Sequence, residues 1–213
     1  MNAAIDVRLS DPSNLEIIRD QISGIIAIEM ANQYEKAVED ADPVKDDYKV
    51  GVYVENDEPW NTNEDNIFPL VNIMIDHVEK NSDSTINTTI RNVQFSIDCY
   101  QTGNYSGKYA GRKATIKAWK LARCVSKILD SDEYTYLGLR GVVKATSIDD
   151  MRLGRPDTNS AMKVYLVRIR FNVEYVEDAP QNSGTELKTM PVTISDENGQ
   201  VVIDITEDIT EEE

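Results

Sequence analysis

Apolar residues recur at three- and four-residue steps near the start of the chain, a spacing that predicts an α-helix with one buried face. Candidate N-cap residues at 10–14 precede this helix, and Asp42-Pro43 ends it near Asp40. Its face consists of Leu15, Ile18, Ile22, Ile26, Met30 and Tyr34. Three further isoleucines widen it: Ile17, Ile25 and Ile28. So broad a face either lies deep in the core or packs against a partner, and the pattern favours the core.

A second helical pattern extends from Gly107 to Leu129, and its expected buried stripe contains Ala114, Ala118, Leu121, Ala122, Val125, Ile128 and Leu129. The segment from Cys99 to Leu129 has seven basic residues and no Asp or Glu. Surface helices usually mix both signs, because like charges four residues apart repel by about 0.2–0.5 kcal/mol. We therefore expect a surface for charged neighbours, with the missing carboxylates on another subunit. A simply solvated helix face is the alternative.

Strands are predicted where apolar and polar residues alternate, over 48–54, 68–78, 93–99, 134–145 and 165–175. Gly138 and Gly141 interrupt the fourth strand and suggest a bend or bulge within it. Such alternation is typical of an antiparallel sheet covered on one side. The order is one helix, three strands, a second helix and two strands. We predict an α+β fold in which an antiparallel or mixed sheet of about five strands is covered by both helices.

The character of the chain changes after Tyr175. We expect one domain over 1–176, a linker over 177–190, and an acidic hairpin and tail over 191–213. Asn198-Gly199 is a strong hairpin signal, and the flanking apolar residues include Val192, Ile194, Val201 and Ile203. From Glu174 onward there are twelve acids and one lysine, a net of eleven negative charges. An isolated hairpin is marginal in water, so it must dock on its own domain, a neighbouring subunit or a partner.

Overall charge changes this picture in one respect. The 213 residues include 38 acidic and 22 basic ones, a net charge of −16, which argues against a dedicated nucleic-acid binder.

Two cysteines, Cys99 and Cys124, are expected to be free thiols in a reducing cytoplasm. No run approaches the ~20 apolar residues of a membrane span, and the start of the sequence lacks the apolar region of a signal peptide.

Catalytic constellations are hard to find. The single histidine, His77, has no nucleophile or orienting carboxylate tied to it by spacing, so a structural role is favoured. The paired carboxylates Asp149-Asp150 and Glu64-Asp65 are explained by solvation, and Trp60 and Trp119 by burial or an interface. We expect no enzyme, cofactor or metal site.

The candidate functional residues form a subunit or partner interface: Arg112, Lys113, Lys117, Lys120, Lys127, Val192, Ile194, Val201 and Ile203.

Two local sequences carry a family resemblance. A strand ending in Ile97-Asp98-Cys99-Tyr100 leads through a turn into the second helix. The turn is glycine-rich, with Gly103, Gly107 and Gly111. The last strand reads Arg168-Ile169-Arg170-Phe171-Asn172-Val173-Glu174-Tyr175. With this order of elements, the chain resembles the tail terminator (tail completion) family of tailed bacteriophages from about Leu15 to Val176. The C-terminal hairpin and acidic end lie outside the resemblance.

The resemblance implies a structural virion protein, made in the bacterial cytoplasm and located at the junction of tail and neck. It implies a homo-oligomeric ring, expected to be a hexamer, that caps the tail tube and stops its polymerisation. Its partners would be the tail tube protein and a neck or connector protein, with the sheath as a further candidate. DNA would pass through the lumen without sequence-specific binding, and no membrane would be involved.

Three other interpretations remain open. A neck or head-completion (head-tail connector) protein would share the size, charge and assembly habit of a terminator. A nucleic-acid-binding module could use the basic helix, although the net charge and the lack of aromatics among the lysines weaken that interpretation. A small-molecule enzyme has the least support.

Overall fold

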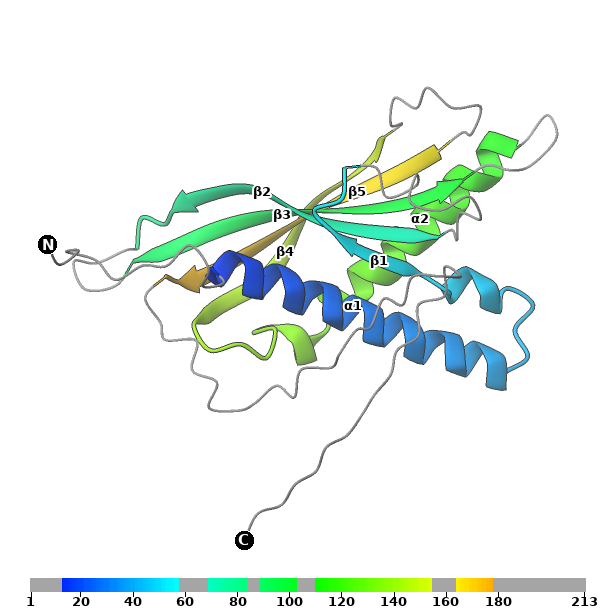
Figure 1. The fold of residues 1–213 in the computed structure, drawn as a ribbon, viewed down its shortest axis with the longest axis horizontal. Helices are drawn as coiled ribbons and strands as arrows, with labels where there is room; N and C mark the ends of the chain where they lie inside the picture. Colours follow the sequence, from blue (N-terminus) through cyan, green and yellow to red (C-terminus); the bar gives the residue numbers. More distant parts are fainter. Residues whose placement is uncertain (1–12, 58–68, 84–88, 103–109, 155–163, 178–213) are drawn as a thin grey trace, which may run out of the picture.

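A computed structural model describes residues 13–57, 69–83, 89–102, 110–154 and 164–177 (Figure 1). The predicted α+β class and the order of helix, three strands, helix and two strands are confirmed. The elements are α1 (Asn14–Glu39), β1 (Gly51–Val54), β2 (Leu70–Lys80), β3 (Ile90–Thr102), α2 (Ala110–Leu129), β4 (Val142–Gly154) and β5 (Val164–Val176), with short 3-10 helices at Lys45–Tyr48 (η1) and Asp132–Tyr134 (η3).

The five strands form one mixed sheet in the order β1-β2-β3-β5-β4. Short β1 pairs with β2 in parallel, and every other pair of neighbours is antiparallel. The last strand of the sequence, β5, is therefore inserted between β3 and β4. Its register with β3 places Phe95 opposite Phe171 and Asp98 opposite Arg168. This register aligns one apolar and one polar face across the middle of the sheet.

The first helix begins where the capping residues predicted. The hydroxyl of Ser13 accepts a hydrogen bond from the Glu16 backbone N–H, and the Glu16 carboxylate accepts one from the Ser13 N–H, which together form a capping box. Burial of Ile18, Ile22 and Ile26 confirms the preferred core interpretation. Of the widening isoleucines, Ile25 is buried, Ile17 is half-buried and Ile28 is exposed.

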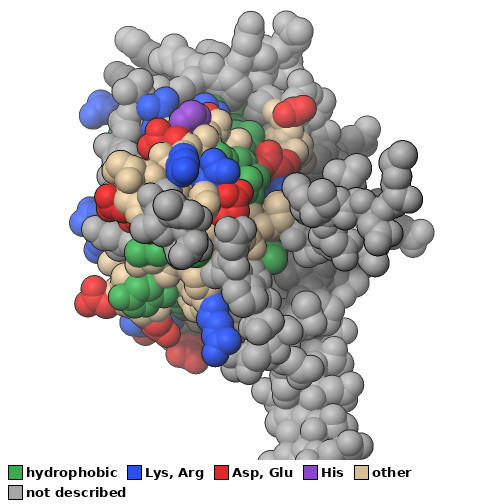
Figure 2. Space-filling model, turned by 90° about the vertical axis from the view of Figure 1, so that its left-hand side faces the viewer, with side chains coloured by type: hydrophobic (Ala, Val, Ile, Leu, Met, Phe, Trp, Pro, Cys, Tyr) green, Lys and Arg blue, Asp and Glu red, His purple; other side chains and the backbone are tan. Residues whose placement is uncertain are grey.

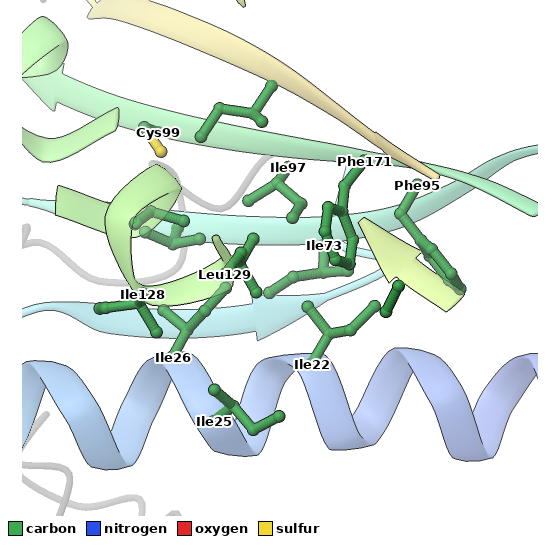
Figure 3. Close-up of a cluster of buried hydrophobic side chains, with 14 of the residues drawn as sticks. Ile22, Ile25, Ile26, Ile73, Phe95, Ile97, Cys99, Ile128, Leu129 and Phe171 are labelled. Atoms are coloured by element: carbon green, nitrogen blue, oxygen red, sulfur yellow. The ribbon is translucent and has the colours of Figure 1, made fainter. Parts of the chain in front are cut away.

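Both helices lie against the same face of the sheet, α1 over β1 and β2 and α2 over β3 and β5, and they share one core. In Figure 3, Ile22 and Ile26 of α1 and Leu129 of α2 point toward Ile73 of β2 and Phe171 of β5. All five side chains are at least 99% buried. Burial of each such side chain contributes roughly 1.5–3 kcal/mol, so this cluster holds the two helices on the sheet.

Two predicted strands differ from the structure. The first strand is shorter than predicted, because Lys45–Tyr48 forms a 3-10 turn and β1 begins at Gly51. The predicted strand over 134–145 is wrong for 134–141, where the chain turns, because β4 begins at Val142. Leu137, Gly138 and Gly141 have φ of 53°, 66° and 85°, and three left-handed residues within five positions do not fit a continuous strand. The apolar side chain of Leu137 is fully buried, so it fills the core from a turn.

Glu177 follows the last residue of β5 and lies at the start of the predicted linker. Its backbone N–H donates to Thr89 O at 2.9 Å, and its carboxylate accepts from Arg91 Nε at 2.8 Å. Asn14 of α1 donates to Glu177 O at 2.7 Å, so this residue is tied to the domain. The rest of the linker and the predicted hairpin with Val192, Ile194, Val201 and Ile203 lie outside the described residues.

Candidate functional site

The basic helix has two distinct faces. All seven residues of its predicted apolar stripe are buried, which confirms that stripe: Ala114, Ala118, Leu121, Ala122, Val125, Ile128 and Leu129. At 3.6 residues per turn, Arg112, Ile116, Trp119 and Arg123 lie on the opposite side of the helix. Figure 1 shows this helix packed along one side of the sheet. Its outer side therefore faces away from the core.

The outer side combines cations with apolar groups. We call it the cationic face of α2 and define it as Arg112, Ile116, Trp119, Lys120, Arg123 and Lys127. The four basic side chains are exposed. Ile116 and Trp119 are 46% and 38% exposed, although each has a large apolar side chain. Lys113 is also exposed and lies beside this face. A cationic surface with an apolar centre is suited to a partner that is both acidic and apolar.

The charges of α2 oppose one another and the helix dipole. Arg112 and Lys113 lie near the helix N-terminus, where the dipole disfavours cations by about 0.3–1 kcal/mol. Arg123 and Lys127 are four residues apart, so this pair adds a repulsion of about 0.2–0.5 kcal/mol. Only Lys127, in the last turn, is placed favourably. This arrangement does not stabilise the isolated helix, and external acidic groups would relieve it.

One of the predicted interface lysines has a partner in its own chain. Lys117 is half-buried, and its Nζ lies 2.6 Å from Asp47 Oδ1 of η1. The expectation that the missing carboxylates all lie on another subunit is therefore wrong for Lys117. The pair joins α2 to the turn between α1 and β1. Because both side chains are about one-third exposed, it contributes at most about 1 kcal/mol.

The sheet face opposite the helices carries a buried ion pair. Asp98 of β3 is 1% exposed, and both of its carboxylate oxygens accept from the Arg168 guanidinium of β5, at 2.7 and 2.8 Å. The Tyr100 hydroxyl donates to the same carboxylate at 3.0 Å. The hydrogen bonds that the guanidinium donates to Asp98 raise the pKa of Arg168. Burial raises the pKa of Tyr100, and the negative charge of Asp98 raises it further. This network fixes the register of the two central strands.

Further polar contacts extend along the same face. The Asn72 amide of β2 donates to Asn56 O at 2.7 Å and accepts from the Asn56 N–H at 3.2 Å. Gln94 donates to Asn172 Oδ1 at 3.1 Å, which links β3 and β5 again. Ser96 Oγ is buried and has no hydrogen-bond partner among the described residues. These contacts join neighbouring strands and bring no nucleophile to a base.

The remaining candidate residues lie apart from these surfaces. His77 is exposed, follows a register shift in β2, and lies 3.8 Å from Glu79. Figure 2 shows acidic and basic side chains mixed on this end of the molecule, around the purple histidine. Burial raises the pKa of the Cys99 and Cys124 thiols, and Cys99 is fully buried. Within the described ranges, no three His, Cys, Asp or Glu side chains are grouped to hold a metal ion.

Two features of the surface were missed by the sequence reasoning. The sequence reasoning places Trp119 either in the interior or at an interface and does not identify Ile116, yet both lie on the cationic face. Their helical phase, opposite the predicted buried stripe, is the signal that identifies them. The Asp98–Arg168 pair could not be found from spacing, because it requires the order of strands in the sheet.

No helix in the described part of the chain is both long enough and apolar enough to span a membrane. No protein-family model matches the chain, and no curated protein matches it either.

Proposed function

We propose that this protein is a structural component of a bacteriophage virion that forms a ring, expected to be hexameric, at the head-proximal end of the tail tube. The ring stops tube polymerisation and joins the tail to the neck. The proposal is supported by the resemblance to tail terminator proteins over residues 15–176. It is also supported by the element order and by the cationic face of α2.

The observation that carries the proposal is the separation of charge. The helix α2 contains six basic residues and no acidic one, so the rest of the chain carries a net charge of −22, that is −16 less 6. A ring of identical subunits joined head to tail needs two different surfaces that complement each other. The cationic face of α2 supplies one of them, and the acidic remainder of the chain offers the other.

The same charge distribution suits a passage for DNA. A lumen lined by basic residues would bind phosphates without sequence preference and slow the passage of DNA. With 38 acidic residues against 22 basic ones, the chain can line a lumen with negative charge while α2 is covered in the subunit contacts. DNA would then pass without being held.

Sedimentation of the purified protein tests the ring, at low and high salt and with and without tail tubes. Six subunits of −16 each repel one another, so we expect a monomer or weak oligomer that closes into a ring on tube ends. Electron microscopy of the tube ends would show the rings directly. A stable dimer under every condition would contradict head-to-tail closure.

A charge-reversal variant tests the role of α2. Replacing Arg112, Lys120 and Lys127 by Glu should leave the fold intact, because all three are exposed, and should abolish ring formation. The control replaces three exposed basic residues elsewhere by Glu, namely Lys45, Lys80 and Arg140. It changes the net charge equally and should still cap tubes. If both variants limit tail length normally, the cationic face is only a solvated surface.

The same assay distinguishes the neck or head-completion alternative. A terminator binds tube ends and limits tube length, whereas a neck protein would bind the connector and leave tube length uncontrolled. No observation on the described residues favours the alternative.

A further inference from the structure

The cationic face of α2 lacks an acidic partner within its own helix, and the chain contains a segment of matching chemistry. We propose that residues 196–213 of the same molecule bind to this face in the isolated subunit. This inference concerns the folded chain alone and does not depend on the phage assignment.

The two surfaces are complementary in charge. Residues 196–213 contain eight acidic and no basic residues. On the helix, Arg112, Lys120, Arg123 and Lys127 are all exposed, and none of these four forms an ion pair with another described residue. Docking of the segment would pair these cations and relieve the repulsion within the helix.

The two surfaces also match in their apolar groups. Ile116 and Trp119 are 46% and 38% exposed on the same side of the helix as the cations. The acidic segment has apolar residues between its acids, including Val201, Ile203 and Ile205. A purely ionic contact would leave Ile116 and Trp119 in water, whereas a segment that contains both acidic and apolar residues covers them. Bases of a nucleic acid could stack on Trp119 but would leave the aliphatic Ile116 uncovered, so this match favours a peptide.

The length of the chain permits binding within one molecule. The chain leaves the sheet beside the turn after α2, because the Val176 N–H donates to Gly141 O at 2.8 Å. The twenty residues of α2 extend over about 30 Å, at about 1.5 Å each. Residues 178–195 can reach roughly 60 Å when extended, at about 3.3 Å each. The acidic segment can therefore reach either end of α2.

The covalent linker determines whether the acidic segment binds α2 of its own molecule or α2 of a second copy. A covalent linker long enough to span two sites gives an effective concentration in the millimolar range. At micromolar protein, the tethered segment therefore outcompetes the segment of a neighbour by about a thousandfold. The isolated subunit accordingly covers its own cationic face, and a neighbouring subunit that needs this face must displace the segment.

Carbodiimide cross-linking of the full-length protein, read by mass spectrometry, tests the contact. We expect cross-links from Lys120 and Lys127 to acids in 196–213, and few from the exposed control lysines Lys45 and Lys80. In an equal mixture of isotope-labelled and unlabelled protein, the links should join residues of one isotopic type. They should be lost at about 1 M salt, where the Debye length is ~3 Å.

A second measurement uses Trp119 in the full-length chain with Trp60 replaced by Phe. Neutralising the eight acids of 196–213 to Asn and Gln should raise quenching of Trp119 by neutral acrylamide at least twofold, whereas neutralising eight exposed acids elsewhere should not. Cross-links of mixed isotopic type would show that the segment binds a second copy, and this would overturn the proposal. Equal cross-linking to Lys45 and Lys80, or unchanged quenching, would also overturn it.

Discussion

Asp98 and Arg168 form a buried ion pair, and we expect replacement of each partner to lower the free energy of unfolding by a different amount. The Asp98 carboxylate is 1% exposed, whereas the Arg168 side chain is 40% exposed. Replacing Arg168 by Met leaves a buried carboxylate whose one remaining described partner is the Tyr100 hydroxyl. Breaking a buried pair in this way costs about 3–5 kcal/mol of unfolding free energy.

Replacing Asp98 by Asn should cost less. The Asn side chain has nearly the same shape, and the partly exposed guanidinium of Arg168 can turn toward water. The variant then loses only the charge-assisted hydrogen bonds, which contribute about 1.5–3 kcal/mol to the free energy of unfolding. The double variant removes both charges, so it should be less destabilised than the sum of the single variants by about 1–3 kcal/mol.

Urea denaturation of the four proteins measures these free energies in one double-mutant cycle. The control is Arg170→Met, which removes a guanidinium from the same face of β5 two residues away, and it should cost less than about 1 kcal/mol. Two results would refute the reasoning. One is an Asp98→Asn variant that is destabilised at least as much as Arg168→Met, and the other is strict additivity in the cycle.

Three further predictions follow from the core and the hydrogen bonds. Replacing the fully buried Ile22 by Ala should cost about 2–5 kcal/mol in urea denaturation, whereas the same change at exposed Ile28 should cost less than about 1 kcal/mol. A hydrogen bond to a carboxylate of α1 raises the pKa of Tyr134 from 10.0 to about 12, so Tyr134→Phe should cost about 1 kcal/mol near neutral pH. That stabilisation is complete below pH 10 and is lost as the pH rises toward about 12, so the difference between the two proteins should vanish over this range. Iodoacetamide should modify Cys124 slowly and Cys99 only after unfolding, as followed by mass spectrometry, and early modification of Cys99 would show that the core opens locally.

The periodic segments of the fold could be predicted from the sequence, and the irregular ones could not. The isoleucines of α1 and the alternation over 165–175 each determine one element, because a single face must be buried in each case. The turn around Leu137 failed for a physical reason. Its apolar residues alternate as in a strand, but left-handed conformations at Leu137, Gly138 and Gly141 turn the chain back. Whether Gly138 and Gly141 form a bulge or a turn depends on where Leu137 packs, which is a tertiary effect.

The same division holds for the candidate site: its regular helical face could be predicted from the sequence, and its long-range contacts could not. The phase of the basic residues on α2 follows from its buried stripe, so their exposure could be expected. The partner of Lys117 could not be predicted, because Asp47 is 70 residues away and lies in a turn that no sequence pattern identifies. The parallel pairing of β1 with β2 likewise has no local signal, since the alternation of a short strand is the same in either direction.

The position of β5 in the middle of the sheet has a consequence for synthesis. Asp98 on β3 and its partner Arg168 on β5 are 70 residues apart, so β3 leaves the ribosome long before the strand that covers its edge. At about 5–20 residues per second, this interval lasts ~4–14 s. Over that time Phe95 and Ile97 have no final neighbours on β5, and β4 has no strand to join. A nascent or prematurely ended chain is therefore a substrate for chaperones, and cellular yield should depend on how quickly residues 100–176 are translated.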